Sequence, residues 1–236
     1  MLEASSVRRA FGSVVAVDDL NLSVAPGELF CMLGANGAGK TTTINLFLGF
    51  IAPDRGTLSV GGVTPGLAPR AARRKIAYIP ENVALYPYLT GLENLELFHE
   101  MARGDRTDLE DLLVESGIGR DKMNRRVDEY SKGMRQKVGL AIAKARGARA
   151  LLLDEPMSGL DPAAANDFCR DLVRVRESGA AVLMTTHDLF RAKELGGTIG
   201  IMRAGRLVDQ FDATDVDANE LESRYLHHMR ETEEAL

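Results

Sequence analysis

Residues 34–42 read GANGAGKTT, and they directly follow the apolar run Leu29–Leu33. Glycine at 34, 37 and 39 lets the backbone bend and turn successive N–H groups toward phosphate oxygens. Lys40 can then reach the β and γ phosphates, Thr41 can bind Mg²⁺, and a helix beginning near Lys40 aims its positive end at the same anion. The strand before and the helix after favour a phosphate-binding loop (P-loop) over a chance glycine-rich turn. The nucleotide-binding residues expected here are Gly34, Ala35, Asn36, Gly37, Ala38, Gly39, Lys40, Thr41 and Thr42.

The composition is that of a chain with enough apolar residues for a sizeable core. Of its 236 residues, 45% are hydrophobic and 27% are charged, and we predict one domain with an inserted subdomain. A net charge of -5 and a pI near 5.5 argue against general affinity for nucleic acid, which requires a basic surface. Cys31 and Cys169 lie in apolar stretches without metal-ligand spacing. We therefore expect free thiols that act as small hydrophobes, as is typical of a reducing cytosol.

The sequence contains no apolar stretch near the ~18 residues of a membrane-spanning helix. Its first residues also lack a charged-then-apolar export signal. We expect that the chain neither spans a membrane nor is exported, so any membrane role would come through a partner.

The first quarter of the chain indicates β structure. Apolar and polar residues alternate over 20–24, and a turn at 25–28 precedes the apolar run before the P-loop. Further short strands are expected at 58–60 and 76–79. This pattern predicts antiparallel strands that lead into a parallel core.

The pattern becomes helical from Thr90 to Ala148. Thr90 and Glu93 can form a capping box, Thr107 and Glu110 repeat it, and Gly117 ends the second helix. The apolar stripe of the first helix consists of Leu92, Leu95, Phe98 and Ala102.

A parallel pattern resumes with a strand at 151–153, a helix at about 163–177 and a strand at 181–184. The prediction is an α/β fold: a P-loop NTPase core with an antiparallel β subdomain and an inserted α-helical subdomain at about 82–148. The domain would span 1–213, and a tail at 214–236 would be helical around 220–229. His227 and His228 in this tail are more typical of a solvated face than of a metal site.

Two carboxylates follow the apolar strand at 151–153. Asp154 and Glu155 would lie at its carboxyl end, where α/β sheets bind ligands. We expect Asp154 to hold Mg²⁺ through water and Glu155 to orient or deprotonate the attacking water. Such a pair alone is a weak signal, and it gains meaning from the P-loop.

Three further motifs occur after the P-loop: YSKGMRQ at 130–136, before the carboxylate pair, and SGLD at 158–161 and THD at 186–188, after it. With the P-loop and the carboxylate pair, this set resembles the nucleotide-binding subunits of ATP-binding cassette (ABC) transporters. The resemblance runs from about residue 2 to residue 210. It implies ATP and Mg²⁺ as ligands and ATP hydrolysis coupled to transport.

The resemblance implies roles for single residues. Ser131 is a plausible helix N-cap, and with Gly133 it would face the P-loop of a second subunit, so that a head-to-tail dimer encloses two ATP molecules. His187 would contact the γ-phosphate, and Asp161 would communicate across the dimer. Phe11 would stack on adenine, the alternative being a place in the core.

Glu81 departs from the common pattern, which has glutamine at this position. A carboxylate can still ligate Mg²⁺. Glutamate here resembles a subset of the family that serves drug, antibiotic, polysaccharide or sodium export. The segment ENVALYPYLTG also resembles the ATPase that assists maturation of the nitrous oxide reductase copper centre.

The leading hypothesis is an energy-coupling subunit at the cytoplasmic face of the membrane. Its partners would be a second copy or a paralogous ATPase subunit and an integral-membrane permease, with no nucleic acid. A soluble cassette ATPase acting on ribosomes or DNA is the alternative class, and a small-molecule kinase would not need YSKGMRQ. An apolar-aromatic group could receive a short helix of the permease or belong to the subdomain core; it comprises Leu85, Tyr86, Tyr88 and Leu89.

Overall fold

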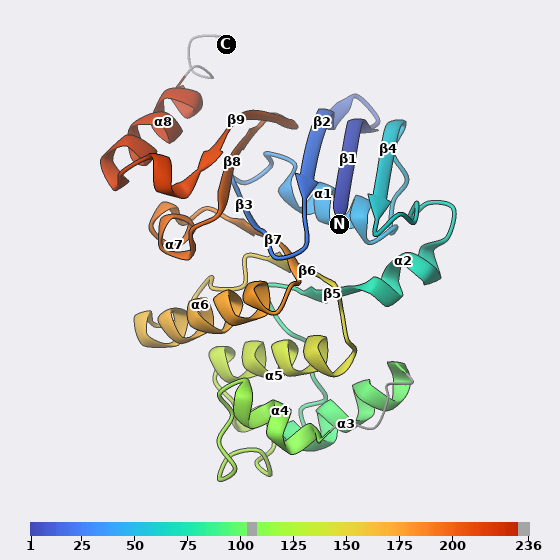
Figure 1. Ribbon diagram of the computed structural model, residues 1–236, viewed down its shortest axis with the longest axis vertical. Coiled ribbons are helices and arrows are strands. Elements are labelled where there is room, and N and C mark those ends of the chain that lie inside the picture. Colours follow the sequence, from blue (N-terminus) through green and yellow to red (C-terminus); the bar gives the residue numbers. More distant parts are fainter. Residues whose placement is uncertain (103–107, 231–236) are drawn as a thin grey trace.

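The computed structural model describes residues 1–102 and 108–230, and two β-sheets form its frame (Figure 1). The first sheet is antiparallel with strand order β2-β1-β4, and the second has strand order β5-β6-β7-β3-β8-β9. In the second sheet, strands β5 to β8 run parallel and only β9 is antiparallel. The strands are β1 (Leu2–Phe11), β2 (Val14–Val24), β3 (Leu29–Leu33), β4 (Arg55–Val60), β5 (Ile76–Ile79), β6 (Ala150–Asp154), β7 (Ala181–Thr186), β8 (Thr198–Arg203) and β9 (Arg206–Asp212).

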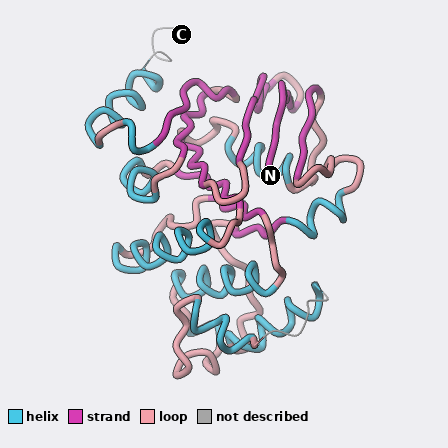
Figure 2. Tube along the Cα trace, in the orientation of Figure 1, coloured by secondary structure: helices cyan, strands magenta, loops and turns pink. Residues whose placement is uncertain are grey.

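The helices cover both faces of the larger sheet and form a separate group at one end of the molecule (Figure 2). They are α1 (Lys40–Phe47), α2 (Pro69–Lys75), α3 (Gly91–Ala102), α4 (Leu109–Glu115), α5 (Lys132–Ala145), α6 (Pro162–Glu177), α7 (Leu189–Leu195) and α8 (Ala218–Arg230), with short 3₁₀ turns η1 (Val127–Glu129) and η2 (Ala213–Asp215). No helix within the described ranges is long and apolar enough to cross a membrane.

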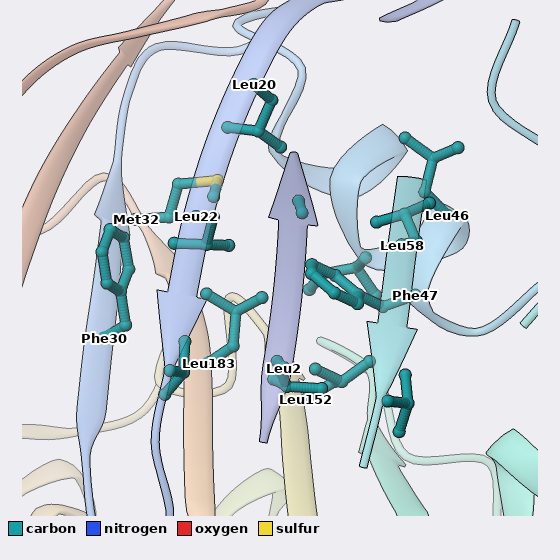
Figure 3. Packing of buried hydrophobic residues seen from close by; sticks show 14 of the residues in the cluster. Leu2, Leu20, Leu22, Phe30, Met32, Leu46, Phe47, Leu58, Leu152 and Leu183 are labelled. Carbon is teal, nitrogen blue, oxygen red and sulfur yellow. The ribbon is translucent and has the colours of Figure 1, made fainter. Parts of the chain in front are cut away.

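The central strand β3 is buried on both sides, which explains its unbroken apolar sequence. Phe30 and Met32 face a cluster shared with α1 and the three-stranded sheet, and Figure 3 labels both among the residues of this cluster, with Leu2 and Leu183. Cys31 lies on the opposite face, in a cluster shared with α6 and α7. Both cysteines are free and buried, as predicted, and burial raises the pKa of each thiol, that of Cys169 to about 11.

A third apolar cluster lies in the helical segment and is built from α3, α4, α5 and the connections between them. The capping box at the start of α3 is confirmed: Thr90 N donates to Glu93 Oε2 at 2.7 Å, and Glu93 N donates to Thr90 Oγ1 at 3.1 Å. The expected stripe is only partly buried. Leu95 is buried but Ala102 is exposed, and the buried face of α3 also carries the polar residues Asn94 and His99.

Thr107, which was predicted to cap the second helix, lies outside the described residues. Asp108 caps α4 and accepts a hydrogen bond from Asp111 N at 3.2 Å. The helix ends at Glu115, and Gly117 follows in the left-handed conformation at φ 79°, as expected for a residue that terminates a helix.

Later elements match the expected positions to within two residues. The helix expected at about 163–177 begins at Pro162, behind the N-cap Asp161, and the tail helix covers Ala218–Arg230 rather than 220–229. Strand β7 extends beyond 184 to Thr186, which matters because its last residues carry polar side chains into the site.

Candidate nucleotide site

A pocket of about 410 Å³ opens at the carboxyl ends of the parallel strands. The P-loop follows β3, Asp154 ends β6, and Glu81 follows β5, so the topology brings segments far apart in sequence to one edge. The pocket is lined by Val14, Val15, Ala16, Ala35, Asn36, Gly37, Ala38, Gly39, Lys40, Thr41, Thr42, Glu81, Asp154 and Glu155.

Two glycines of the P-loop occupy positions where a side chain would clash with the backbone of other segments. A Cβ on Gly34 would lie 2.5 Å from Met202 O, and Gly39 has a φ of 106° with Ala16 O only 2.3 Å from its Cβ position. Lys40, 6% exposed, begins α1 and donates from Nζ to Gly34 O at 2.6 Å and Ala35 O at 3.3 Å. The lysine ammonium is therefore held inside the loop that would cradle a phosphate.

Glu155 lies between the side chains of Lys40 and His187. Its Oε1 is 3.5 Å from Lys40 Nζ, and its Oε2 is 2.9 Å from His187 Nδ1. The residue has a φ of 47°, a left-handed conformation that costs of order 1–3 kcal/mol for a residue with a Cβ. Oε1 is buried and has no hydrogen-bond partner among the described residues. Such an acceptor, aimed at the pocket and free to take a hydrogen bond, suits the positioning of a water molecule.

Thr185 holds both carboxylate residues and was not identified from the sequence. Its Oγ1 donates to Asp154 Oδ1 at 2.6 Å and accepts from Glu155 N at 3.2 Å. The parallel pairing of β6 and β7 sets Asp154 beside Thr185. The side chain is fully buried, so the hydroxyl fixes the direction of Asp154 without competition from water.

Glu81 reaches the pocket from the loop after β5. Its Oε1 accepts from Lys132 Nζ at 3.3 Å and from Ser158 Oγ at 3.0 Å. The Ser158 hydrogen bond and the Lys132 ammonium lower the pKa of this carboxyl. The buried Gln136 donates from Nε2 to the carbonyl oxygens of Pro80 and Glu81, at 3.2 Å and 2.9 Å. Helix α5 therefore holds both the backbone and the side chain of this loop, through residues that sequence reasoning missed.

Several predicted residues lie outside the pocket lining. Ser131 caps α5 as predicted and accepts from Met134 N at 3.2 Å. Gly133 is buried, and a Cβ there would lie 3.1 Å from Ala164 Cβ, so this glycine also permits α5 to pack against α6. Asp161 caps α6 and accepts from Ala164 N at 2.9 Å.

Phe11 is also absent from the pocket lining. It is 46% exposed at the end of β1, with the Arg9 guanidinium 4.7 Å from its ring centroid. This exposure excludes a place in the core. Val14 and Val15, which the sequence reasoning did not single out, line the pocket on the far side of the same hairpin.

The pocket chemistry fits a hard cation that is shared with a ligand. Thr41, Glu81 and Asp154 present oxygen atoms, the ligand type that Mg²⁺ prefers. Among the described residues no group of three or more His, Cys, Asp and Glu could hold a metal ion alone. Mg²⁺ here would complete its shell with water and phosphate oxygens. His227 and His228 in α8 form no such group either, and His228 Nε2 lies 3.4 Å from Asp209 Oδ2.

A P-loop at the end of a central parallel strand, with two carboxylates beside it, defines an α/β nucleotide-binding protein of the P-loop class. The sequence profile of the ABC transporter family matches residues 17–158, and the chain belongs to this family. It is an ABC-type ATPase that binds ATP.

Similar proteins cover nearly the whole chain. It is 34% identical over 236 residues to the Bacillus subtilis ABC transporter ATP-binding protein YhcH, covering 100% of this chain and 77% of that protein. It is 34% identical over 223 residues to Nod factor export ATP-binding protein I of Paraburkholderia xenovorans, covering 93% and 73%. A solved ATP-binding subunit of an ABC transporter superimposes with a TM-score of 0.83 at 30% identity, covering 96% of this chain and 99% of the other.

Proposed function

We propose that this chain is the energy-coupling subunit of an ABC exporter, which drives a separate membrane permease by binding and hydrolysing ATP in a head-to-tail dimer. One observation carries the proposal most directly: the Glu155 carboxylate lies between Lys40 and His187 beside the P-loop, and its buried Oε1 accepts no hydrogen bond within the described residues. This arrangement supports the alignment of a water molecule against a γ-phosphate.

The proposed division of labour in the pocket follows from the contacts. P-loop N–H groups bind the phosphates, and Lys40 exchanges the carbonyls of Gly34 and Ala35 for β and γ phosphate oxygens. Glu155 accepts the proton of the attacking water or orients it, and His187 holds Glu155 and the γ-phosphate. Thr41, Asp154 and Glu81 would hold Mg²⁺, which neutralises charge on the β and γ phosphates. Phe11, exposed near Val14 and Val15, offers a ring for adenine.

The dimer is proposed because Ser131 and Gly133 lie outside the pocket of their own chain. Ser131 and Gly133 open α5, a helix of 14 residues, with a terminus suited to an anion. A second chain in head-to-tail orientation would bring that terminus to the γ-phosphate of its partner. Asp161 is the last residue of the SGLD motif and the N-cap of α6. It would communicate between the two nucleotide sites of the dimer.

We propose an ATPase domain at 1–213, with a helical subdomain at about 82–148, followed by a tail at 214–236. The permease would dock on the helical subdomain, at the cytoplasmic face of the membrane. Tyr86 and Tyr88 are 52% and 77% exposed there, while Leu85 packs on the subdomain core. The export direction is supported by the similarity to a Nod factor export protein and by Glu81 in place of glutamine.

The test is fractionation of cells that make the tagged chain from its own gene. We expect the chain to float with membranes and to co-purify, in a fixed ratio, with one polytopic permease that changes its Mg²⁺-dependent ATPase rate. Co-sedimentation with ribosomes, or nucleic-acid-stimulated hydrolysis without any permease, would instead support the soluble cassette class.

A further inference from the structure

Positive charge is concentrated in two segments of a chain that is acidic as a whole. Residues 55–80 and 130–153 contain no Asp or Glu and together carry eleven Lys and Arg residues, although the net charge of the chain is -5. Segregation of this kind creates a local positive potential that the net charge hides.

The fold places parts of both segments side by side at the edge of the larger sheet. Strands β5 and β6 are paired in parallel from Ile76 and Ala150, and Arg149 N donates to Lys75 O at 3.0 Å. The guanidinium of Arg146 donates to Arg73 O at 3.2 Å. Figure 1 shows α2 leading into β5 at this edge. We call this region the basic patch, formed by Arg70, Arg73, Arg74, Arg146 and Arg149.

The basic patch is unneutralised and exposed. Arg70, Arg74, Arg146 and Arg149 are all exposed, and none of the five arginines forms an ion pair within the described part of the chain. It adjoins the amino ends of β5 and β6, whereas the ATP pocket opens at their carboxyl ends. The two sites are therefore separate.

Two exposed apolar side chains border the basic patch. Leu67 is 87% exposed in the loop before α2, and Phe50 is 59% exposed with the Arg73 guanidinium 6.0 Å from its ring centroid. A Cβ on Gly49 would lie 3.1 Å from Pro65 O, so the segments that carry Phe50 and Leu67 are adjacent. Arginines beside a protruding leucine and phenylalanine combine attraction to anionic headgroups with apolar groups that can enter the headgroup region.

We propose that the basic patch, with Phe50 and Leu67, binds an anionic phospholipid surface. Nucleic acid would use the arginines but would leave Leu67 without a role, and the lipid surface uses both kinds of side chain. The inference rests on the proposed function, because a subunit docked on a permease lies beside the membrane. Contact with lipid would orient the subunit and add to its affinity for the permease.

The test uses the purified chain and permease-free vesicles, either of phosphatidylcholine alone or with 30% phosphatidylserine. We expect binding to the anionic vesicles only, weakened by salt. Arg70→Gln/Arg73→Gln/Arg74→Gln should reduce binding at least about tenfold. Phe50→Ser/Leu67→Ser should reduce it at moderate salt while leaving the salt dependence in place.

The matched control removes three exposed cations elsewhere, Arg120→Gln/Arg125→Gln/Arg170→Gln, and should bind like the unaltered chain. Equal loss in this control would reduce the effect to net charge and overturn the proposal. So would equal binding to neutral vesicles, or tighter binding of a 20-nucleotide single-stranded DNA than of the anionic vesicles. All variants should keep the ATPase rate of the unaltered chain, and failure of vesicle binding with normal permease coupling would refute the lipid contact alone.

Discussion

Lys132 Nζ lies 3.3 Å from Glu81 Oε1, so the first turn of α5 holds a carboxylate of the ATP pocket. Ser131 caps the same turn and is proposed to face the nucleotide of the partner chain. One ion pair thus connects the loop of Glu81, a proposed metal ligand of the chain's own site, to the segment that would contact the other site. The pair is partly exposed, so solvent screens it and its strength is modest.

Glu81 itself gives the first prediction. Glu81→Gln keeps an oxygen ligand of the same length and removes a negative charge near the γ-phosphate, so ATP affinity should hold or rise slightly. Glu81→Ala removes the ligand and should impair hydrolysis much more than binding, because the P-loop still binds the phosphates. Steady-state ATPase rates and ATP binding measured for both variants decide this. Equal, near-normal hydrolysis rates in the two would exclude a metal-ligand role.

Lys132→Met should change the Mg²⁺ requirement. Without the competing ammonium, Glu81 is free to turn to the metal, and half-maximal ATPase activity should need roughly 1.5- to 5-fold less Mg²⁺, the range of an exposed ion pair of ~0.2–1 kcal/mol. The control is the same substitution in a Glu81→Gln background, where no shift is expected. A shift of the same size in both backgrounds would show that Lys132 acts on something other than Glu81.

Thr185→Val should separate catalysis from binding. It leaves the Asp154 carboxylate without its 2.6 Å donor and the Glu155 backbone N without its side-chain acceptor, so Asp154 loses its fixed direction and the backbone that carries Glu155 loses a contact. We expect kcat to fall about 10- to 100-fold, equivalent to ~1–3 kcal/mol, with little change in ATP affinity. Thr185→Ser restores the hydroxyl and should restore kcat. If both variants lose stability and activity alike, the residue only packs the strand.

Assignment of Ser131 to the partner's nucleotide predicts complementation between chains. Lys40→Ala should weaken ATP binding at least about 100-fold by removing a buried ammonium from the phosphates. Ser131→Asp keeps a good N-cap but sets a negative charge against the partner's γ-phosphate. It is a cleaner probe than a change at Gly133, which packs against Ala164.

A mixture of the two chains should form dimers with one intact site and one doubly damaged site. ATPase activity in that mixture should exceed the activity of either parent. If the mixture is no more active than the parents while one intact site can turn over, Ser131 does not act across the dimer.

The sequence predicted the parts of this fold that depend on local patterns. The Thr90 capping box and the Ser131 cap each join residues three positions apart, so a motif contains the whole interaction. The P-loop was recognised from its glycine pattern, although the close contacts that require Gly34 and Gly39 come from Met202 and Ala16, far away in the sequence. The contact of Lys132 with Glu81 joins residues 51 positions apart, and it depends on how α5 packs beside β5. No local pattern predicts it.

The sequence did not predict the role of Thr185 or the elements α2 and β9, because their local patterns are weak or typical of another role. Thr185 lies in a fully buried strand and reads as core, and only the pairing of β6 with β7 reveals its contacts. The helix α2 has seven residues, three of them arginines, and no apolar stripe, and β9 is only partly buried, so neither gives a strong periodic signal. The pocket lining includes Val14, three residues after Phe11, and the stacking of Phe11 on adenine stays a prediction.

The most direct test of the account is sedimentation of the Glu155→Gln variant with saturating ATP and Mg²⁺, alone and in complex with its permease. The substitution keeps the size of the side chain but removes the carboxylate that we propose accepts the water's proton, so turnover should fall by roughly 10²- to 10⁴-fold while ATP still binds. Since hydrolysis would normally reopen the closed state, the variant should sediment as a stable ATP-bound dimer, and ADP should leave it a monomer. A monomer under saturating ATP in both preparations, or turnover equal to that of the unaltered chain, would contradict the proposed mechanism.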